Sequence, residues 1–300
     1  MLTATDPPAC PQIVVADGGA RRLAATPPAA GTVGLAWLGQ AGFLVRTANH
    51  TILIDPYLSD VLAAKYRGRE FAHERLMPAP IAVGAIDRLD LVLCTHKHSD
   101  HMDPDTLAEI AARHPSCRFI VPAAEVDYAR ALGLPAERLL PLDAEETASP
   151  LDALSVTAVP AAHESLEHDA AGRCRYLGYV VRAEGLTLYH SGDTVPFQGL
   201  PELLGRMGVD CALLPVNGRD AFRSDRGVPG NMHAAEAIAL CRTAGIPLLV
   251  PHHFGMFAFN TASAADLDLL RACTAPRTVI PDPDHHLILT VSTTPAETNS

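Results

Sequence analysis

The chain has 300 residues, of which 48% are hydrophobic and 19% are charged, and its formal net charge is −11. This composition can build a sizeable hydrophobic core and excludes a disordered or collagen-like chain. The negative charge argues against a general affinity for nucleic acid, which needs a dense surface of Lys and Arg, so we expect no nucleic-acid partner.

The N-terminal segment is rich in Ala, Pro and Gly and contains two Pro-Pro pairs. Because proline resists both helix interiors and central strands, we predict an extended arm over residues 1–30 and a single domain over residues 31–300. The arm has no Lys or Arg before Arg21 and no continuous apolar run, which argues against a secretory signal peptide. No later segment approaches the roughly 18 apolar residues of a membrane span. We therefore expect a cytoplasmic protein with no membrane partner.

Short apolar runs broken by Gly and Asn begin at Thr32 and predict adjacent strands over residues 32–58. Residues 89–96 predict a buried strand, and residues 105–114 predict a helix with Asp103 as its N-cap and a proline at its first position. Downstream of this helix, we predict a strand at 119–123, a helix at 124–134 and a strand at 154–163 that runs into a loop.

The second half of the chain repeats this alternation of strands and helices. We predict a hairpin that turns at Glu184-Gly185, strands at 211–217, 248–253 and 285–291, and helices at 233–243 and 263–271. Two such halves favour an α/β fold in which two sheets pack face to face with helices outside, a four-layer αββα sandwich.

The densest chemical motif directly follows the buried strand at 89–96, where His96, His98, Asp100 and His101 fall within six residues. His96 and His98 are alternate residues and can point to the same side of the chain. Asp100 and His101 can turn towards a second position, so the segment can bind two metal ions. Imidazole and carboxylate suit zinc, manganese or ferrous iron. The alternative, a merely solvated loop, gives no reason for such clustering. The seven cysteines are scattered without a CxxC pair, and we expect them to be buried hydrophobes.

The segment THKHSDH is similar to the HxHxDH motif of the metallo-β-lactamase superfamily. That resemblance implies two divalent metal ions, zinc or manganese, and places His163, Asp193 and His253 after later strands as further ligands. Taken singly, His163 could be a loop residue and Asp193 a turn residue. The family's Pro-x-His pattern selects His253 over its neighbour His252. The implied set is His96, His98 and His163 on one metal, Asp100, His101 and His253 on the other, and Asp193 between them.

Five further segments resemble the L-ascorbate-6-phosphate lactonase-like branch of that superfamily: AWLGQAGFLV, LYHSGDT, LLPVNGRD, GNMHAAEA and VPHHFGMFAFNT. This resemblance implies a cytoplasmic, metal-dependent hydrolase that forms a homo-oligomer and opens a lactone or similar bond in a small anionic substrate. Where many relatives carry an acidic residue two positions after the last ligand, this chain has Gly255. That departure bears on substrate choice and on support of the metal.

The implied chemistry is attack by a hydroxide that bridges the two metals. We expect Asp100 and Asp193 to hold the water and relay its proton, and His190 to protonate the leaving oxygen. The alternative for His190 is that it packs in its strand or orients Asp193.

For substrate contacts the sequence offers Asn217, Arg219, His233 and His252. Arg219, in the NGRD motif, is the preferred guanidinium for a phosphate or carboxylate. Arg223 and Arg226 either join it or pair with the nearby Asp220 and Asp225. Gln40 and Gly42 line the site or merely form a tight hairpin, and the MFAFNT stretch is a pocket wall or an oligomer contact.

Two other functions compete with the lactonase-like hydrolase. The same two-metal site would serve a phosphodiesterase, although the negative charge disfavours a nuclease. A catalytically silent regulatory protein that binds a metal or ligand is the other alternative. The presence of competent residues at all seven ligand positions argues against such loss of turnover.

Overall fold

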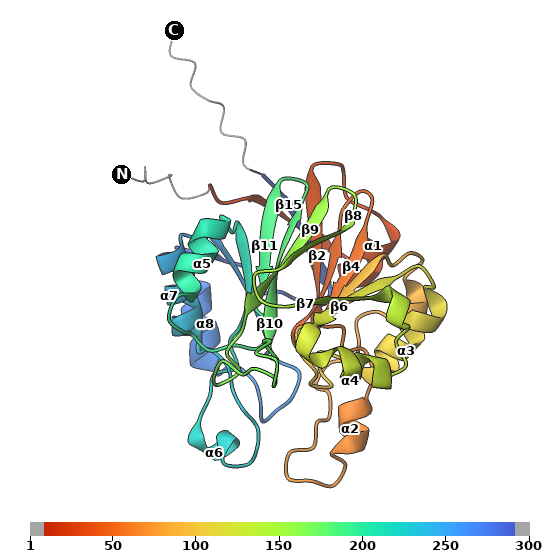
Figure 1. Cartoon of the computed structure of the whole chain (residues 1–300). Helices are drawn as coiled ribbons and strands as arrows, with labels where there is room; N and C mark the ends of the chain where they lie inside the picture. The colour runs from red at the N-terminus through yellow and green to blue at the C-terminus, as the bar shows by residue number, and fades with distance from the viewer. Residues whose placement is uncertain (1–8, 292–300) are drawn as a thin grey trace.

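The computed structural model describes residues 9–291, which form two mixed β-sheets packed face to face between layers of helices (Figure 1). The first sheet contains, in spatial order, β1 (Gln12–Asp17), β15 (His285–Thr290), β2 (Thr32–Gly39), β3 (Gly42–Arg46), β4 (Thr51–Ile54), β5 (Leu91–Leu93), β6 (Arg118–Pro122) and β7 (Leu139–Leu142). The second contains β14 (Arg277–Thr278), β13 (Leu248–His252), β12 (Cys211–Pro215), β11 (Leu186–His190), β10 (Leu177–Ala183), β9 (Leu154–Pro160) and β8 (Thr147–Leu151).

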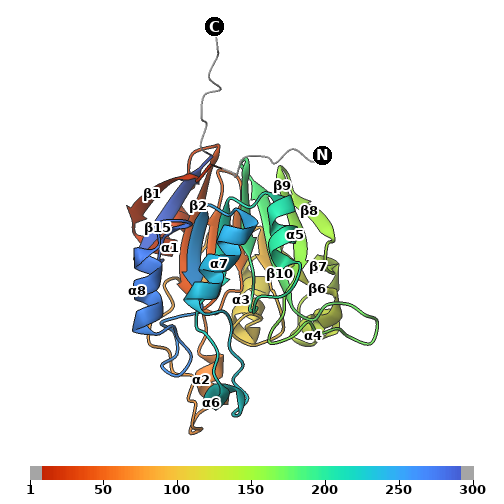
Figure 2. The same cartoon turned by 90° about the vertical axis from the view of Figure 1, so that its left-hand side faces the viewer.

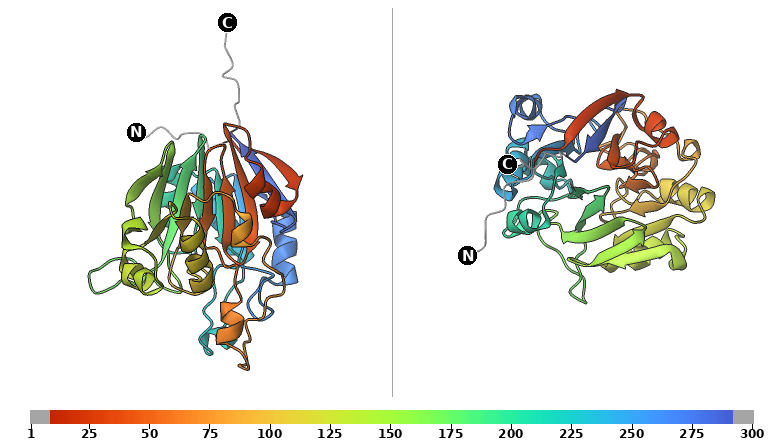
Figure 3. Two further views of the ribbon diagram at one scale, coloured as in Figure 1. Left: turned by 90° about the vertical axis from the view of Figure 1, so that its right-hand side faces the viewer. Right: turned by 90° about the horizontal axis from the view of Figure 1, so that it is seen from above.

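Helices cover the outer faces of both sheets. The α-helices are α1 (Gly19–Ala25), α2 (Val61–Lys65), α3 (Pro104–Arg113), α4 (Val126–Ala131), α5 (Leu200–Met207), α6 (Ala221–Ser224), α7 (Ala234–Ala244) and α8 (Ala264–Ala272). Three short 3-10 turns lie at Val83–Ala85, Ala123–Glu125 and Ala136–Arg138. Figure 2 shows α5, α7 and α8 over the second sheet, and Figure 3 shows the opposite side of the molecule and the two layers of strands from above. The predicted four-layer sandwich is confirmed.

The central strands of the first sheet, β2 to β6, are buried on both faces, which explains their nearly continuous apolar runs. In β2, Leu35 and Trp37 belong to the core between the two sheets, whereas Ala36 and Leu38 belong to the core under the outer helices. Side chains alternate between the faces of a strand, so one apolar run supplies both cores. The sequence pattern of β2 thus fixes the sheet in the middle of the sandwich.

Local signals set several of the boundaries. The carboxylate of Asp103 accepts hydrogen bonds from the backbone N–H groups of Asp105 and Thr106, and Pro104 is the first residue of α3, as predicted. The predicted hairpin between β10 and β11 is also confirmed, with Glu184 and Gly185 in the left-handed region at φ values of 52° and 79°.

The N-terminal segment departs from the predicted extended arm over residues 1–30. Within the described residues, β1 pairs antiparallel with β15, and α1 packs on the first sheet. Leu23 of α1 is only 1% exposed and belongs to the core that contains Leu38 and Leu44. Burial of this leucine stabilises a short helix that its own sequence supports weakly. Residues 1–8 of the predicted arm lie outside the described residues.

The chain directions bring four strand ends to one edge of the sandwich. The carboxyl ends of β5 in the first sheet, and of β9, β11 and β13 in the second, all lead into loops at that edge. In Figure 1 it is the lower edge, from which α2 and α6 project. Among residues 9–291, no helix combines the length and apolar character that a membrane crossing requires.

The packing of α1 gives a direct test of its role. Leu23→Ala should lower the free energy of unfolding by about 2–5 kcal/mol, because it removes buried methyl groups and leaves a cavity. Leu269→Ala in α8 is the matched control, since Leu269 is 43% exposed and should change stability by less than about 1 kcal/mol. Denaturant titration measures both values. Equal effects of the two substitutions would show that the N-terminal helix does not stabilise the fold.

Candidate functional site

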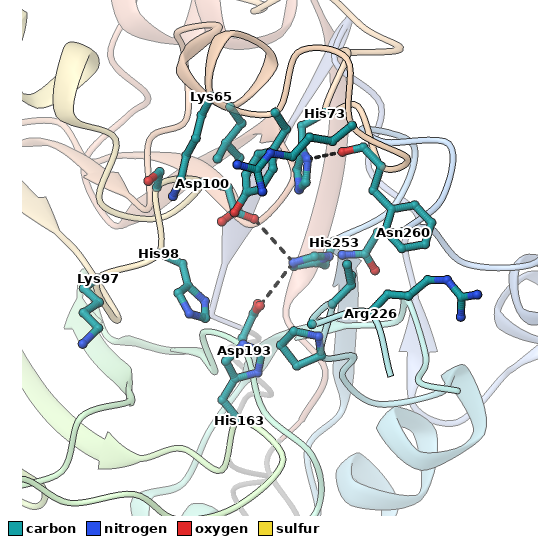
Figure 4. A pocket seen from close by; sticks show the side chains of 18 of the residues that line it. Lys65, His73, Lys97, His98, Asp100, His163, Asp193, Arg226, His253 and Asn260 are labelled. Atoms are coloured by element: carbon teal, nitrogen blue, oxygen red, sulfur yellow. Dashed lines mark hydrogen bonds and ion pairs between the residues drawn. The ribbon is translucent and has the colours of Figure 1, made fainter. Parts of the chain in front are cut away.

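Four loops at one edge of the sandwich bring histidines and aspartates together (Figure 4). The loop after β5 carries the HKHSDH segment, and the loops after β9, β11 and β13 carry His163, Asp193 and His253. Within each of three overlapping clusters, the ligand atoms lie within 4.8 Å of one another. The clusters are His96, His98 and His163; His96, His101 and Asp193; and Asp100, His101 and His253. The structure therefore brings together all seven residues that the sequence proposes as metal ligands.

The first cluster consists of imidazoles alone. His96 Nε2 lies 2.9 Å from His98 Nδ1, and the ring of His163 is 5.1 Å from that of His98 between centroids. The buried Nδ1 atom of His163 makes no hydrogen bond within the described part of the chain. Burial lowers the pKa of His163 to about 4 and lowers the pKa of His96 well below its usual value. These rings are therefore neutral near pH 7, which is the form that binds metal.

The second cluster adds the carboxylates. Asp193 lies between two imidazoles, with Oδ1 3.4 Å from His101 Nε2 and Oδ2 3.2 Å from His253 Nε2. Asp100 Oδ2 lies 3.7 Å from His101 Nε2 and 3.9 Å from His253 Nε2. Burial opposes ionisation of Asp193, but His253 and His101 outweigh it and hold the pKa of this carboxyl well below its usual value. Both carboxyls are thus ready to bind a cation.

The turn that carries Asp193 depends on the glycine before it. Gly192 has a φ of 60°, and a Cβ at this position would lie 2.8 Å from the backbone oxygen of Leu177 and 2.9 Å from Thr95 Oγ1. Only glycine fits such a close approach in the left-handed region without displacing its neighbours. The Ser-Gly-Asp sequence is therefore a tight turn that aims Asp193 at the loop after β5.

Asp55, which the sequence analysis does not single out, fixes the orientation of His101. Asp55 is fully buried, and its Oδ2 accepts hydrogen bonds from His101 Nδ1 at 2.7 Å and Thr95 Oγ1 at 2.6 Å. With one proton held on Nδ1 by Asp55, Nε2 is the nitrogen of His101 that faces the cluster. Burial alone would lower the pKa of His101, but Asp193, Asp55 and Asp100 raise it well above its usual value, so a metal ion at Nε2 would take the place of a proton.

Thr95 links Asp55 to His96 and so orients the His96 ring as well. The single hydroxyl proton of Thr95 goes to Asp55, so the contact of 3.1 Å between Thr95 Oγ1 and His96 Nδ1 requires the proton to lie on Nδ1 of His96. His96 Nε2 then carries the lone pair that faces the cluster, 2.9 Å from His98 Nδ1. One buried carboxylate thus sets the tautomers of two histidines.

Gln40, in the turn between β2 and β3, lies at the same centre. Its Nε2 donates to Asp100 Oδ2 at 2.8 Å and lies 3.2 Å from His253 Nε2, while its backbone oxygen accepts the N–H of His253. His253 itself has a φ of 61°, an uncommon conformation for a side chain other than glycine. The GQAGF turn is therefore more than a hairpin, because it holds the last strand end in place. Gly255, two positions after His253, has a φ of 66° and donates its N–H to Thr261 Oγ1.

A pocket of about 590 Å³ opens over the clusters, and His98, Asp100, His163, Asp193 and His253 form part of its wall. The remaining wall carries four cations and several aromatic rings: Lys65, Arg69, Lys97, Arg226, Tyr66, Phe71, His73 and Tyr128. Lys97 lies 3.6 Å from Glu125 and Arg226 lies 3.3 Å from Glu70, whereas Lys65 and Arg69 form no ion pair with the described residues. No motif in the sequence marks Lys65, Arg69 or His73, because they stand at the end of α2 or in the irregular segment after it.

His190 is not placed to protonate a substrate. Its ring is 1% exposed and does not line the pocket. Nε2 donates to the backbone oxygen of Ala41 at 2.7 Å, and Nδ1 accepts the N–H of Gly192 at 3.1 Å. Both nitrogens are occupied, which contradicts the predicted proton donor and fits the alternative of a ring that orients the Asp193 turn. His252 stacks on His190 at 4.8 Å and is fully buried, so the predicted contact with substrate is also contradicted.

The other predicted substrate contacts lie outside this pocket. Asn217, Arg219 and His233 line a separate depression of about 380 Å³ beside α6. Both terminal nitrogens of Arg219 bind the carboxylate of Glu236 at 2.6 Å, so this guanidinium is already engaged. Arg223 pairs with Asp220, which was the predicted alternative to a substrate contact, whereas Arg226 lines the pocket. The MFAFNT stretch is a wall element, since Asn260 lines the pocket and Phe257 packs beneath it against Tyr57.

The donor set and its unpartnered atoms fit divalent metal ions. His101 Nε2, Asp193 Oδ1, His163 Nδ1 and His253 Nδ1 are buried and make no hydrogen bond within residues 9–291. Buried polar atoms without partners are costly, and a cation among neutral imidazoles and ionised carboxylates would satisfy those that face the clusters. All seven cysteines are free and none belongs to a cluster of the described residues, so the donors are nitrogen and oxygen only.

Comparisons with known proteins agree with this geometry. Residues 50–254 match the family described as beta-lactamase superfamily domain. A protein named UPF0173 metal-dependent hydrolase, from Opitutus terrae, is 33% identical over 224 residues, which cover 73% of this chain and 84% of the relative.

Two solved structures share the fold. A metallo hydrolase from Ignicoccus hospitalis has a TM-score of 0.62 at 19% identity, over 86% of this chain and 98% of that protein. An isothiocyanate hydrolase from Delia radicum gut bacteria has a TM-score of 0.66 at 18% identity, over 84% and 97%. At such low identity the likeness concerns the fold and does not transfer a substrate.

The role of Asp55 can be tested without an assay of activity. Asp55→Asn should weaken the binding of zinc or manganese by about 10- to 100-fold, because the amide no longer holds the proton on Nδ1 of His101. Metal titration by calorimetry measures the change. The control is Asp210→Asn, whose carboxylate accepts the N–H of Thr187 at the start of β11, the end of that strand away from Asp193, and does not line the pocket. Unchanged affinity in Asp55→Asn would show that Asp55 does not support metal binding.

Proposed function

This chain belongs to the metallo-β-lactamase superfamily and to its UPF0173 metal-dependent hydrolase family, and on that premise we propose that it opens a lactone or similar ester-like bond in a small anionic substrate. The observation that carries the proposal is the position of the clustered histidines and aspartates in the wall of a pocket that also carries cations. The finer assignment to the L-ascorbate-6-phosphate lactonase-like branch comes from the sequence motifs and is part of the same proposal.

We propose that two divalent metal ions, zinc or manganese, bind at the clusters. His96, His98 and His163 would hold one ion, Asp100, His101 and His253 the other, and Asp193 both. Bound ions supply Lewis acidity, which makes water nucleophilic near neutral pH and polarises the bond to be cleaved. The chain contributes the ordered lone pairs, because Asp55 and Thr95 orient His101 and His96 before any ion arrives.

Asp100 and Asp193 are the groups that would orient the attacking water. The nearby histidines His101 and His253 hold the pKa of both carboxyls below the usual value despite burial, so both stay ionised and accept hydrogen bonds. Gln40 fixes Asp100 through the hydrogen bond to Oδ2, which leaves its other oxygen free of this contact. A water held between two carboxylates has its lone pairs directed away from them and towards the substrate.

The pocket supports an anionic substrate of small size. Its volume of about 590 Å³ falls within the range of small-molecule sites. Lys65 and Arg69, unpaired among the described residues, stand in the wall of a protein whose net charge is −11. Cations left without carboxylate partners in an acidic protein favour a substrate that brings its own negative charge. The aromatic rings beside them suit an apolar body.

A phosphodiesterase is the second candidate, because the same cations suit a phosphodiester and the same donor set suits attack on phosphorus. The two activities are separated with one panel: lactones and open-chain esters, each with and without a carboxylate, and bis-p-nitrophenyl phosphate. The purified protein is assayed as isolated, after chelation, and after zinc or manganese is restored. We expect hydrolysis of the anionic lactones and esters, lost on chelation and regained with metal. Turnover of the phosphodiester alone would reverse the ranking, and metal binding without turnover would favour a silent binding protein.

The role proposed for Lys65 and Arg69 in the pocket wall can be tested by substitution. The double variant Lys65→Ala/Arg69→Ala should raise KM for carboxylate-bearing esters by about 10-fold or more, because each lost charge-assisted hydrogen bond is worth about 1.5–3 kcal/mol. KM for the neutral esters should stay within about twofold. Arg271→Ala in α8 is the control, since Arg271 pairs with Asp268 outside the pocket. Equal effects on charged and neutral esters would contradict the proposed recognition.

A further inference from the structure

His73 is a pocket residue without a role in the metal clusters. It lies in the irregular segment after α2, and Figure 4 shows its ring on the side of the pocket that holds Asp100. Four histidines line the pocket: His73, His98, His163 and His253. The last three belong to the clusters, so His73 is the remaining imidazole of the described wall. An imidazole in this position needs an explanation, because a hydrolase with an alkoxide leaving group needs a proton carrier.

The tautomer of His73 is set by a backbone carbonyl. His73 Nδ1 lies 2.9 Å from the backbone oxygen of Phe71. A carbonyl oxygen can only accept, so Nδ1 carries the proton and Nε2 of the neutral ring is a bare lone pair. Nε2 is not among the buried polar atoms that lack a partner, which agrees with its access to the pocket. The ring is therefore prepared to take up a proton at Nε2.

Aromatic side chains hold the ring on several sides. Tyr66 stacks on His73 with centroids 4.2 Å apart and an interplanar angle of 24°. Phe257 and Phe259 meet it edge to face at 5.0 Å and 4.8 Å. Such packing fixes the direction of Nε2, as a proton-transfer group requires. Burial lowers the pKa of His73, with the Phe71 carbonyl and the charge of Asp100 opposing, so the ring is neutral near pH 7.

We propose that His73 is the catalytic proton carrier of the reaction, an inference that rests on the proposed ester hydrolysis. Nε2 takes a proton from the attacking water as its oxygen bonds to the carbonyl carbon. The same proton then passes from Nε2 to the leaving oxygen as the carbon–oxygen bond breaks. The ring ends neutral, so protons balance and no further reactant is needed. His190, which the sequence suggested for this task, has both nitrogens bound to the backbone.

The test compares two esters that differ only in the leaving group, monoethyl adipate and mono-4-nitrophenyl adipate, with the metal-loaded protein. Ethoxide needs a proton to leave, whereas 4-nitrophenolate does not. His73→Gln should lower kcat for the ethyl ester by about 100-fold or more and for the nitrophenyl ester by less than about threefold. KM and bound metal should not change. His73→Asn serves as the second variant, because its amide can still donate to the Phe71 carbonyl, and it should show the same difference.

His50→Gln is the matched control. The ring of His50 also binds a backbone carbonyl, that of Asp152 at 2.9 Å, but it does not line the pocket, and both esters should be turned over as in the wild type. An equal loss of kcat for the two esters in both His73 variants would overturn the assignment and leave His73 a packing residue. No turnover of either ester by the wild-type holoenzyme would refute the proposed function, and this role with it.

Discussion

Everything at this site depends on the burial of several imidazoles and two carboxylates around one centre. Asp100 and Asp193 both line the pocket, on either side of His253 Nε2 (Figure 4), and four ligand-type atoms are buried without a hydrogen bond among the described residues. Two carboxylates in such a place repel each other, and His101 offsets their charge only while it holds a second proton, which a metal ion would replace. A divalent cation supplies the missing charge. The strand ends, the Gly192 turn and the Asp55 carboxylate serve to hold these groups in place until that charge arrives.

The cluster at residues 96–101 could be predicted because it follows an apolar strand, whereas His163, Asp193 and His253 were implied by the resemblance to the metallo-β-lactamase superfamily. The structure shows why they meet: the strands before them end at a shared edge. Support for the ligands was harder to predict. Asp55 stands alone between a strand and a proline, and nothing in ILIDPY says that its side chain reaches His101 across 46 positions. The prediction for Arg219 was wrong for a different reason: a guanidinium in a glycine-rich loop suggests an anion site, but Glu236 in α7, 17 positions along the chain, already binds it.

The fold, like the site, was predictable where neighbouring residues determine the structure and not where contacts between distant segments determine it. Short apolar runs broken by turn residues predicted β2, β3 and the β10–β11 hairpin, because both signals lie within a few residues of one another. The composition of the N-terminal segment hid β1 and α1, since their stability comes from pairing with β15 at the far end of the chain and from one buried leucine. Composition describes a segment alone, and this segment folds only against the rest of the sheet.

The central claim is that two metal ions bind among seven side chains, and anomalous X-ray diffraction from crystals of the zinc- or manganese-loaded protein tests it most directly. The account predicts two anomalous peaks, one among His96, His98 and His163 and the other among Asp100, His101 and His253, with Asp193 between them. Peaks at other residues, or none at these in crystals of active protein, would contradict it.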